Sequence, residues 1–369
     1  MTEWIECTLD KLGEIVGGAT PSTKCEDYYG GSIPWITPKD LSSFKGRYIT
    51  SGERNITEKG LASCSAQMMP KDAVLFTSRA PIGYVAIASQ SVCTNQGFKS
   101  IVVNEKADPL FVYYLLKYNK DAIEAMGSGT TFKEVSGKTM RAVKVRIPLD
   151  VSYQNRIAAV LDSLDTKIEN NERINDNLQQ QAQAIYSSMF IDNPDPAWSH
   201  GHLSDLITVK YGKDHKKLAD GIYPVYGSGG IMRYVERPLY NKESVLIPRK
   251  GTLNNVMYVN QPFWSVDTMF YTEMKLPNVA KFVYHFVKAK DLASMNAGSA
   301  VPSMTTDILN AMEVVIPSAS ALEEFESLVA PMYEAMEAND VQSKALSQMR
   351  DTLLPKLMSG EIDVSAVQL

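Results

Sequence analysis

The sequence lacks the features that mark several large classes of protein. No apolar run among its 369 residues is long enough to span a bilayer, and the N-terminus carries no secretory signal. The four cysteines show no CxxC spacing; they are Cys7, Cys25, Cys64 and Cys93. We therefore expect a cytoplasmic protein with free thiols rather than a secreted disulfide scaffold.

Catalytic motifs are also missing. There is no GxxxxGK[ST] phosphate loop, no GxGxxG after a strand, and no HExxH or GxSxG. Gly227-Ser228-Gly229-Gly230 does not fit a nucleotide loop, and His200-Gly201-His202 has no third ligand nearby, so no metal site is expected. The sequence favours a protein without catalysis of its own, and an enzyme with an unrecognised site remains an alternative.

Charge is unevenly distributed along the chain. The formal net charge is −5, but residues 210–250 hold nine basic and four acidic residues, a local charge of +5. Residues 319–369 hold nine acidic and three basic residues, a local charge of −6. A basic face of this kind can bind a polyanion despite a negative total, although a solvated lysine-rich loop explains the same charge equally well.

An internal repeat runs through most of the sequence. Ile33-Pro34-Trp35 matches Tyr223-Pro224-Val225, and residues 72–75 match residues 243–246. Residues 129–148 match residues 298–317 without a gap. The N-terminal pattern Trp4, Leu9, Leu12, Ile15 and Gly18 recurs 194 residues later as Trp198, Leu203, Leu206, Val209 and Gly212. The first copy is 19 residues longer between its Pro34 and Val74, which indicates a loop insertion on a common scaffold.

A heptad pattern also occurs twice, with steps that alternate four and three residues. The first copy is Ile157, Leu161, Leu164, Ile168, Asn171, Asn175, Leu178, Ala182, Ile185 and Met189. The second copy, 168 residues later, is Phe325, Val329, Met332, Met336, Asn339, Ser343, Leu346, Arg350, Leu353 and Leu357. This spacing places each set on one stripe of a long helix, and the shared polar break suggests that Asn171 and Asn339 set the register. Two unrelated amphipathic helices would be the simpler alternative.

The predicted fold class is α+β, with two similar mixed α/β domains joined by two long helices. These helices would form an antiparallel coiled coil with pseudo-two-fold symmetry. The predicted boundaries are a first domain at 1–150, a central helix at 151–192, a second domain at 193–318, a C-terminal helix at 319–360 and a tail at 361–369. Each domain is expected to contain one helix, near Pro109–Tyr118 in the first and Val279–Ala289 in the second, with short strands bounded by Gly, Pro and Asn.

The ends of the long helices can be predicted from their flanking residues. Ser320 and Glu323 resemble a capping box for the second helix, and Gly360 marks its end. Pro331 should kink this helix or split off its first turns. A helix of about 38 residues is roughly 57 Å long, which limits two binding faces at its ends to about 17 base pairs of duplex DNA. The repeat thus predicts a protein that reads a split DNA site with a fixed gap.

These features resemble the specificity (S) subunit of type I restriction-modification enzymes over the whole chain. The resemblance is carried by residues 12–22 (Leu-Gly-Glu-Ile through Thr-Pro-Ser), by residues 33–41, and by the Ile-Pro junctions at 147–148 and 316–317. The tail Leu353-Leu354-Pro355-Lys356-Leu357-Met358-Ser359-Gly360-Glu361-Ile362 is its most specific part.

This resemblance implies two target-recognition domains, each of which reads half of a bipartite sequence in double-stranded DNA. It implies that the coiled coil docks methyltransferase (M) subunits, two in number, and restriction-translocase (R) subunits. It also implies that the chain has no catalytic activity, and that S-adenosylmethionine, ATP and Mg²⁺ are bound by the partner subunits. A coiled-coil adaptor that binds protein and not DNA is the alternative from a different functional class.

The candidate DNA contacts are predicted from side-chain chemistry, because the resemblance transfers no base-reading residue. Lys, Arg, hydroxyl and amide side chains on turn-rich segments suit phosphates and base edges. In the first domain they are Thr20, Ser22, Lys39, Ser78, Arg79, Asn95, Gln96, Lys99, Thr130 and Lys133. In the second they are Tyr211, Lys213, Lys216, Lys217, Tyr226, Ser228, Arg249, Lys250, Asn254 and Asn255.

Overall fold

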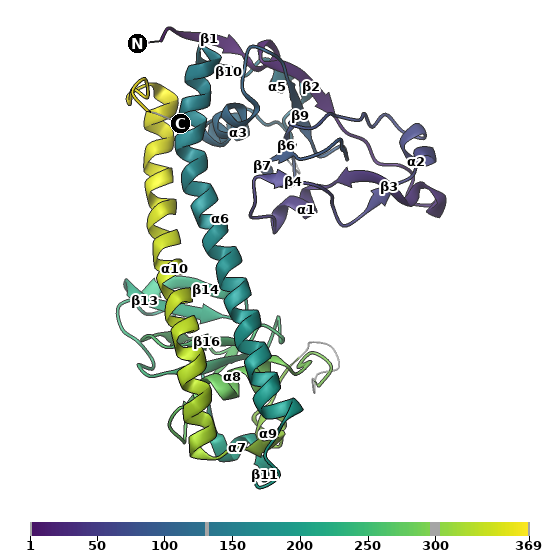
Figure 1. Cartoon of the computed structure of the whole chain (residues 1–369). Coiled ribbons are helices and arrows are strands. Elements are labelled where there is room, and N and C mark those ends of the chain that lie inside the picture. The colour runs from purple at the N-terminus through teal and green to yellow at the C-terminus, as the bar shows by residue number, and fades with distance from the viewer. Residues whose placement is uncertain (1, 130–132, 296–302, 368–369) are drawn as a thin grey trace. The chain divides into compact units, whose positions relative to one another are not determined.

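The computed structural model describes residues 2–129, 133–295 and 303–367. The chain forms two compact units (Figure 1). Unit 1 comprises residues 1–172 and 340–369, and unit 2 comprises residues 173–339. Within the described residues, no helix is both long and apolar enough to cross a membrane.

Unit 1 contains three sheets. A two-stranded sheet pairs β1 (Trp4–Thr8) with β10 (Lys144–Pro148) in antiparallel orientation. The five-stranded sheet has the order β2 (Gly13–Gly17), β9 (Lys99–Val103), β6 (Val74–Ser78), β7 (Ile82–Ala88) and β4 (Tyr48–Ile49). The three-stranded sheet has the order β5 (Asn55–Ile56), β3 (Tyr29–Ile36) and β8 (Cys93–Thr94). Its short helices are α1 (Pro38–Ser42), α2 (Glu58–Ala62), α3 (Pro109–Tyr118), α4 (Lys120–Ala125), α5 (Gly137–Arg141) and the 3₁₀ turns Leu9–Lys11 and Glu26–Tyr28.

Unit 2 repeats this arrangement. Here β11 (Ser199–His202) pairs with β19 (Glu313–Ile316). The larger sheet has the order β12 (Ile207–Tyr211), β18 (Met269–Met274), β15 (Ser244–Pro248) and β16 (Met257–Val259). The smaller sheet has the order β14 (Gly230–Val235), β13 (Asp220–Gly227) and β17 (Trp264–Ser265). Its short helices are α7 (Leu203–Leu206), α8 (Ala280–Lys288) and α9 (Thr306–Asn310). The prediction of one helix in each domain is therefore wrong in number, although α3 and α8 lie where those two helices were expected.

The sheet topology confirms the repeat deduced from sequence. The order β2-β9-β6-β7 in unit 1 corresponds to β12-β18-β15-β16 in unit 2. In each small sheet the central strand pairs parallel with one neighbour, β3 with β8 and β13 with β17. The insertion is also located: β14 follows β13 after a two-residue turn, whereas residues 37–54, with α1 and β4, separate β3 from β5.

Two long helices, α6 (Val151–Ser187) and α10 (Ala319–Ser359), contribute to both units. A π-helical turn at Ser188–Asp192 follows α6, and Gly360 ends α10 with a φ of +78°. The N-cap of α10 is Ser318, whose hydroxyl accepts the Ala321 N–H at 3.3 Å, so the predicted capping box at Ser320 is wrong by two residues.

Pro331 does not split α10, which is continuous from residue 319 to residue 359. Proline removes one backbone hydrogen bond from a helix. Val329 and Tyr333, on either side of Pro331, are both buried in the same core of unit 2. This packing holds the two halves of the helix together despite the missing bond.

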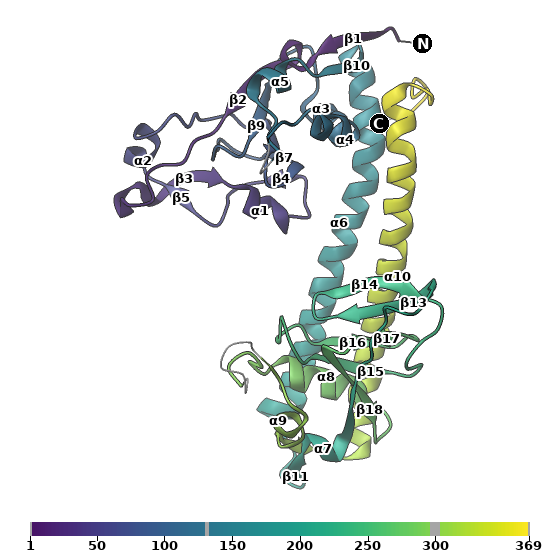
Figure 2. The same cartoon turned by 180° about the vertical axis from the view of Figure 1, so that it is seen from behind.

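Each half of the helix pair is part of the core of its own unit. In unit 1, Ile157, Leu161 and Leu357 pack with residues of α3. In unit 2, Ala182, Phe325 and Val329 pack with residues of α8. The two helices lie side by side in both views of the molecule (Figure 1 and Figure 2). The remaining residues of the predicted seam are at least half-buried, namely Leu164, Ile168, Leu178, Ile185, Met189, Met332, Met336, Leu346 and Leu353.

The polar break of the seam forms hydrogen bonds between the helices. In unit 1, Asn171 donates to the side chains of Gln342 at 2.9 Å and Ser343 at 3.1 Å. In unit 2, Asn339 donates to the Asn175 side chain at 2.8 Å. Since Asn171 corresponds to Asn339 and Asn175 to Ser343, the two contacts are equivalents in the repeat. In unit 1, Asp165 also forms an ion pair with Arg350 at 2.7 Å. From Asp165 to Asn171 to Asn175 along α6, the partners on α10 are Arg350, Ser343 and Asn339, with falling numbers. The two helices are therefore antiparallel.

Candidate nucleic-acid interface

In unit 1, several predicted contacts gather at one end of the larger sheet. Here β2 and β6 end and β9 begins, with Gly17 paired to Lys99 and Ser78 N–H bonded to the Gly97 carbonyl at 2.7 Å. Gly18 passes so close that a Cβ atom would lie 2.2 Å from the carbonyl oxygens of Thr94 and Asn95. We define site 1 as Thr20, Arg79, Asn95, Gln96, Lys99 and Glu134.

The side chains of site 1 already form hydrogen bonds or ion pairs within unit 1. The Thr20 hydroxyl donates to the Gln96 side-chain oxygen, and the Asn95 side chain accepts the Gly97 N–H at 2.8 Å. Glu134 lies between two cations, 3.5 Å from an Arg79 nitrogen and 3.7 Å from Lys99 Nζ. The carboxylate of Glu134 therefore compensates much of the positive charge at this end of the sheet. Glu134 was not among the residues predicted from sequence.

The larger sheet of unit 2 has a corresponding end, which is formed by equivalent backbone contacts. The Ala19 N–H bonds to Thr94 in unit 1, and the equivalent Lys213 N–H bonds to the Ser265 carbonyl at 2.8 Å. Gly212, the equivalent of Gly18, is equally close to its neighbours, since a Cβ would lie 2.0 Å from the Val266 oxygen. We define site 2 as Tyr211, Lys213, Ser228, Arg249, Lys250 and Asn255.

Site 2 differs from site 1 in its charges. The guanidinium of Arg249 lies 5.5 Å from the centre of the Tyr211 ring, and Asn255 donates to the Ser228 carbonyl at 2.8 Å. Lys250, the equivalent of Arg79, forms a backbone bridge with Ser303, where Arg79 bridges to Glu134. No ion pair within the described residues involves Lys213, Arg249 or Lys250, so site 2 keeps its positive charge.

Several predicted contacts lie away from these two sites or must be withdrawn. Ser78 is fully buried and donates to the Gly97 carbonyl at 3.2 Å, and Tyr226 is nine-tenths buried with its hydroxyl near the Gln261 amide, so neither side chain presents a face to DNA. Ser78 is the last residue of β6 and Tyr226 the second-last residue of β13, positions at which the sequence alone does not show which way a polar side chain faces. The exposed side chains outside the sites are Ser22, Lys133, Lys216, Lys217 and Asn254, and Asn254 donates to Asp291 at 3.0 Å. Thr130 lies outside the described residues.

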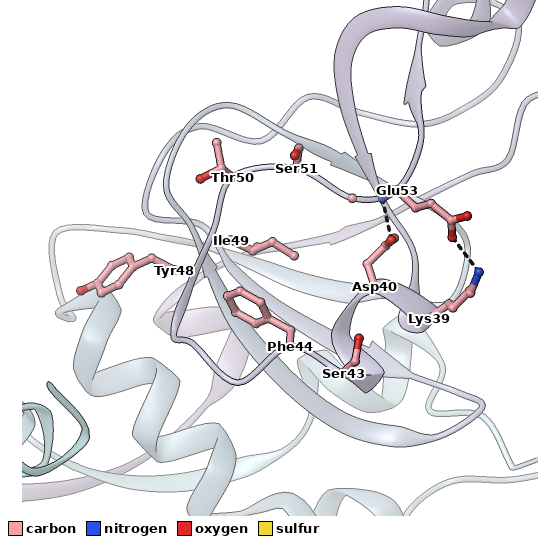
Figure 3. Close-up of a pocket in the computed structure, with 10 residues that line it drawn as sticks. Lys39, Asp40, Ser43, Phe44, Tyr48, Ile49, Thr50, Ser51 and Glu53 are labelled. Carbon is pink, nitrogen blue, oxygen red and sulfur yellow. Dashed lines mark hydrogen bonds and ion pairs between the residues drawn. The ribbon is translucent and has the colours of Figure 1, made fainter. Parts of the chain in front are cut away.

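Lys39 lies on the insertion of unit 1, beside an open hollow of about 440 Å³. Its ammonium meets Glu53 at 2.6 Å, and Asp40 accepts the Glu53 N–H at 2.7 Å (Figure 3). Phe44, Tyr48 and Ile49 line the same hollow (Figure 3). These contacts shape the loop at residues 50–53, and unit 2 has no counterpart to this part of the chain.

The described residues include no cluster of three or more His, Cys, Asp or Glu side chains placed to hold a metal ion. The four cysteines are free thiols, and burial raises the pKa of the Cys93 thiol to about 12. At neutral pH Cys93 is therefore a protonated core residue and a poor nucleophile. What the two sheet ends offer is hydrogen-bond donors and cations, the groups that contact phosphates and base edges.

Comparison with known proteins agrees with these observations. The family model described as "Type I restriction modification DNA specificity domain" matches twice, at residues 1–180 and 197–325. A type I restriction enzyme specificity subunit (MjaIX) from Methanocaldococcus jannaschii is 32% identical, covering 98% of this chain and 94% of that protein. The EcoprrI specificity subunit from Escherichia coli is 23% identical, covering 90% and 89%.

A solved structure shares the fold. The crystal structure of the type I restriction-modification S subunit from M. genitalium matches with a TM-score of 0.63 at 19% sequence identity, covering 96% of each chain. Together, the two-fold match of the family model, the relative at 32% identity and the shared fold leave one conclusion: the chain belongs to the family of type I restriction-modification specificity subunits.

Proposed function

We propose that this chain is the DNA-recognition subunit of a type I restriction-modification complex, in which unit 1 reads one half of a bipartite target and unit 2 reads the other. The observation that carries the proposal is the repetition of one backbone framework, at Gly18 and Gly212, with different side chains around it. A shared framework suits the same task in both units. Different side chains suit two half-sites of different sequence.

The helices α6 and α10 would serve as the platform for partner subunits. Their paired faces are buried, while many outward positions such as Asn177, Gln180 and Gln181 on α6 are exposed. We propose that methyltransferase subunits, two per chain, and restriction-translocase subunits dock on such positions. The repeat supports two docking places, because the Asn171–Ser343 contact between the helices in unit 1 has its equivalent in the Asn175–Asn339 contact in unit 2.

Catalysis would then belong entirely to those partners. S-adenosylmethionine, ATP and Mg²⁺ would be bound by the methyltransferase and restriction subunits, while this chain recognises the target sequence in the DNA. An adaptor that binds only protein is the second candidate function. The basic character of site 2 favours DNA, because an uncompensated cluster of Lys and Arg attracts phosphates.

The test is coexpression of the full chain with its methyltransferase in a host without DNA methylation, followed by single-molecule sequencing of methylated bases. The expected result is a split motif with a constant gap. Exchange of residues 1–150 for those of a relative should then change one half of the motif only. A methyltransferase complex that purifies but shows no salt-dependent DNA binding would overturn DNA recognition in favour of the adaptor role.

A further inference from the structure

Site 2 contains a pair of side chains that has no counterpart in site 1. Tyr211, the last residue of β12, corresponds to Gly17, and Arg249, directly after β15, corresponds to the buried Ser78. The backbone framework around the two positions is the same in both units. The Tyr211–Arg249 pair is thus an addition to a shared scaffold, which is where a unit-specific task is expected.

Both the backbone and the side chain of Arg249 have partners within unit 2. Its N–H donates to the Thr268 carbonyl at 2.9 Å, and its carbonyl accepts the Met304 N–H at 2.9 Å. The side chain donates from Nη1 to the Asp267 carbonyl at 3.3 Å, and its guanidinium lies 5.5 Å from the centre of the Tyr211 ring. Tyr211 in turn packs edge-on against the buried Phe270, with ring centres 5.0 Å apart. A restrained guanidinium loses little conformational entropy when it binds.

The remaining donors of this guanidinium suit one kind of ligand. Arginine has five N–H donors in a planar fork, and Asp267 takes one of them. A fork of this type forms two parallel hydrogen bonds to the O6 and N7 atoms of guanine in the major groove. The neighbouring Lys250 is an exposed, flexible ammonium, which suits a phosphate contact that carries no sequence information.

We propose that Arg249 determines specificity in unit 2 by reading a guanine of its half-site, and that Tyr211 is a positioning residue that holds the guanidinium. This inference rests on the proposed function, since it names a base read by a site already assigned to DNA. It predicts at least one G·C pair in the half-site of unit 2. Unit 1 has Gly17 and Ser78 at the two positions, so it lacks this pair of side chains.

The test compares the methylated motif of the wild-type complex with that of Arg249→Gln, Arg249→Lys, Tyr211→Ala and Tyr211→Phe. In Arg249→Gln, discrimination at one G·C position of one half-site should fall roughly ten- to hundredfold, while the other half-site stays unchanged. Tyr211→Ala should relax the same position less, and Tyr211→Phe, which keeps the ring face, should restore it. Lys250→Gln is the matched control and should lower methylation of all target variants by the same factor.

The possible outcomes test the proposed function and the role of Arg249 separately. A wild-type complex without any split motif would overturn the proposed function itself. An intact split motif whose base preferences are unchanged in Arg249→Gln, or a loss that is uniform across target variants, would overturn the role of Arg249 alone. Should Arg249→Gln fail to fold, Arg249→Lys keeps the charge, and an unrelaxed motif in a folded lysine variant would equally overturn the proposal.

Discussion

Tyr114 of unit 1 and His285 of unit 2 occupy the same position of equivalent helices, α3 and α8, but form different contacts with α6 and α10. The Tyr114 hydroxyl donates to Asp165 at 2.8 Å, and Asp165 also meets Arg350 at 2.7 Å. His285 instead lies 2.9 Å from the Tyr333 hydroxyl and 2.8 Å from the Gln183 side-chain oxygen. Asp165 and Tyr333 are themselves equivalents in the heptad repeat.

The comparison shows which property of a repeat is retained and which diverges. A buried polar contact between the short helix and a long helix is kept in both units, because a buried polar group needs a partner. Its chemistry is ionic in unit 1 and neutral in unit 2. The sheet ends follow the same rule, with a shared glycine framework and a carboxylate, Glu134, at site 1 where site 2 has Ser303.

The largest difference between the units is the insertion at residues 37–54 of unit 1. Arg47→Met should remove the contact that holds this insertion against α6. Arg47 is 6% exposed and reaches α6, where its guanidinium forms ion pairs with the carboxylates of Asp162 at 2.9 Å and Glu169 at 3.0 Å. Removing the cation leaves two carboxylates partly buried, so we expect a loss of about 3 kcal/mol in the free energy of unfolding. Urea denaturation measures this loss, and hydrogen exchange should rise at residues 37–54.

Lys39→Met is the matched control for this experiment. Lys39 lies on the same insertion, but its pair with Glu53 is exposed, so the change should stay within about 0.5 kcal/mol. Equal destabilisation by the two substitutions would contradict the role of Arg47 as an anchor.

Mild acid should distinguish the two polar contacts. Burial lowers the pKa of His285 to about 4, so His285 is neutral in the folded protein where an unfolded histidine, with a pKa near 6.5, already binds a proton. The unfolded state therefore gains protons first, and stability from this group is lost as pH falls from about 6.5 to 4, by up to about 3 kcal/mol. Burial raises the pKa of the equivalent Tyr114, which does not titrate in this range.

Hydrogen exchange at several pH values measures this difference, since it reports the two units separately. We expect α8 to lose protection between pH 6.5 and 4, and His285→Gln to remove most of that dependence. In unit 1, hydrogen bonds from Ser365 and Tyr153 lower the pKa of Asp363 to about 2, so its contribution is lost only below pH 3.8. A wild-type profile that the His285→Gln variant reproduces would rule out this histidine as the cause.

The polar break of the helix pair occurs in both units, so replacing its asparagines should affect the stability of both. We expect Asn171→Leu combined with Asn339→Leu to raise stability by about 1 kcal/mol and to loosen the register, because a polar seam position trades stability for a unique pairing. Thermal melting measures the stability, and disulfide trapping with cysteines placed at register positions measures the pairing. A double variant with one trapped register and full activity would show that these asparagines do not set it.

Much of the fold was predictable because the repeat appears at the level of single residues. The matched strands, the insertion and the two seams follow from offsets in the sequence, and α3 lies at the residues predicted for it, Pro109–Tyr118. The start of α10 agrees with the predicted residue 319, but its capping residue was assigned wrongly. Ser320 fits a capping box because Glu323 stands three residues later, whereas Ser318, which has Ala321 at that position, is the residue whose hydroxyl caps the helix. The continuity of α10 at Pro331 depends on tertiary packing, which local preferences do not describe.

The candidate sites were harder to predict than the fold. Choosing Lys, Arg, hydroxyl and amide residues on turns found Arg79, Lys99, Arg249 and Lys250, which the structure brings to equivalent sheet ends. The same criterion could not recognise that Ser78 and Tyr226 are buried, since polar residues at strand ends can face either way. It also missed Glu134, because an acidic residue is not chosen as a DNA contact, although the gap-free match of Glu134 with Ser303 was visible in the sequence.

Glu134→Ser should make site 1 resemble site 2, with the smallest effect of the series. Removing this carboxylate frees Arg79 and Lys99 for phosphates, so we expect the methyltransferase complex to bind DNA about three- to tenfold more tightly, with a salt dependence steeper by about one counterion. The reciprocal Ser303→Glu should weaken binding by a similar factor. Fluorescence anisotropy over a range of salt concentrations measures both. Glu58→Ser is the control, because it removes an exposed carboxylate of α2 that lies outside site 1. It should change the affinity for DNA less than Glu134→Ser does. An equal gain in affinity from the two substitutions would show that only the net charge of the chain matters, and not the position of Glu134.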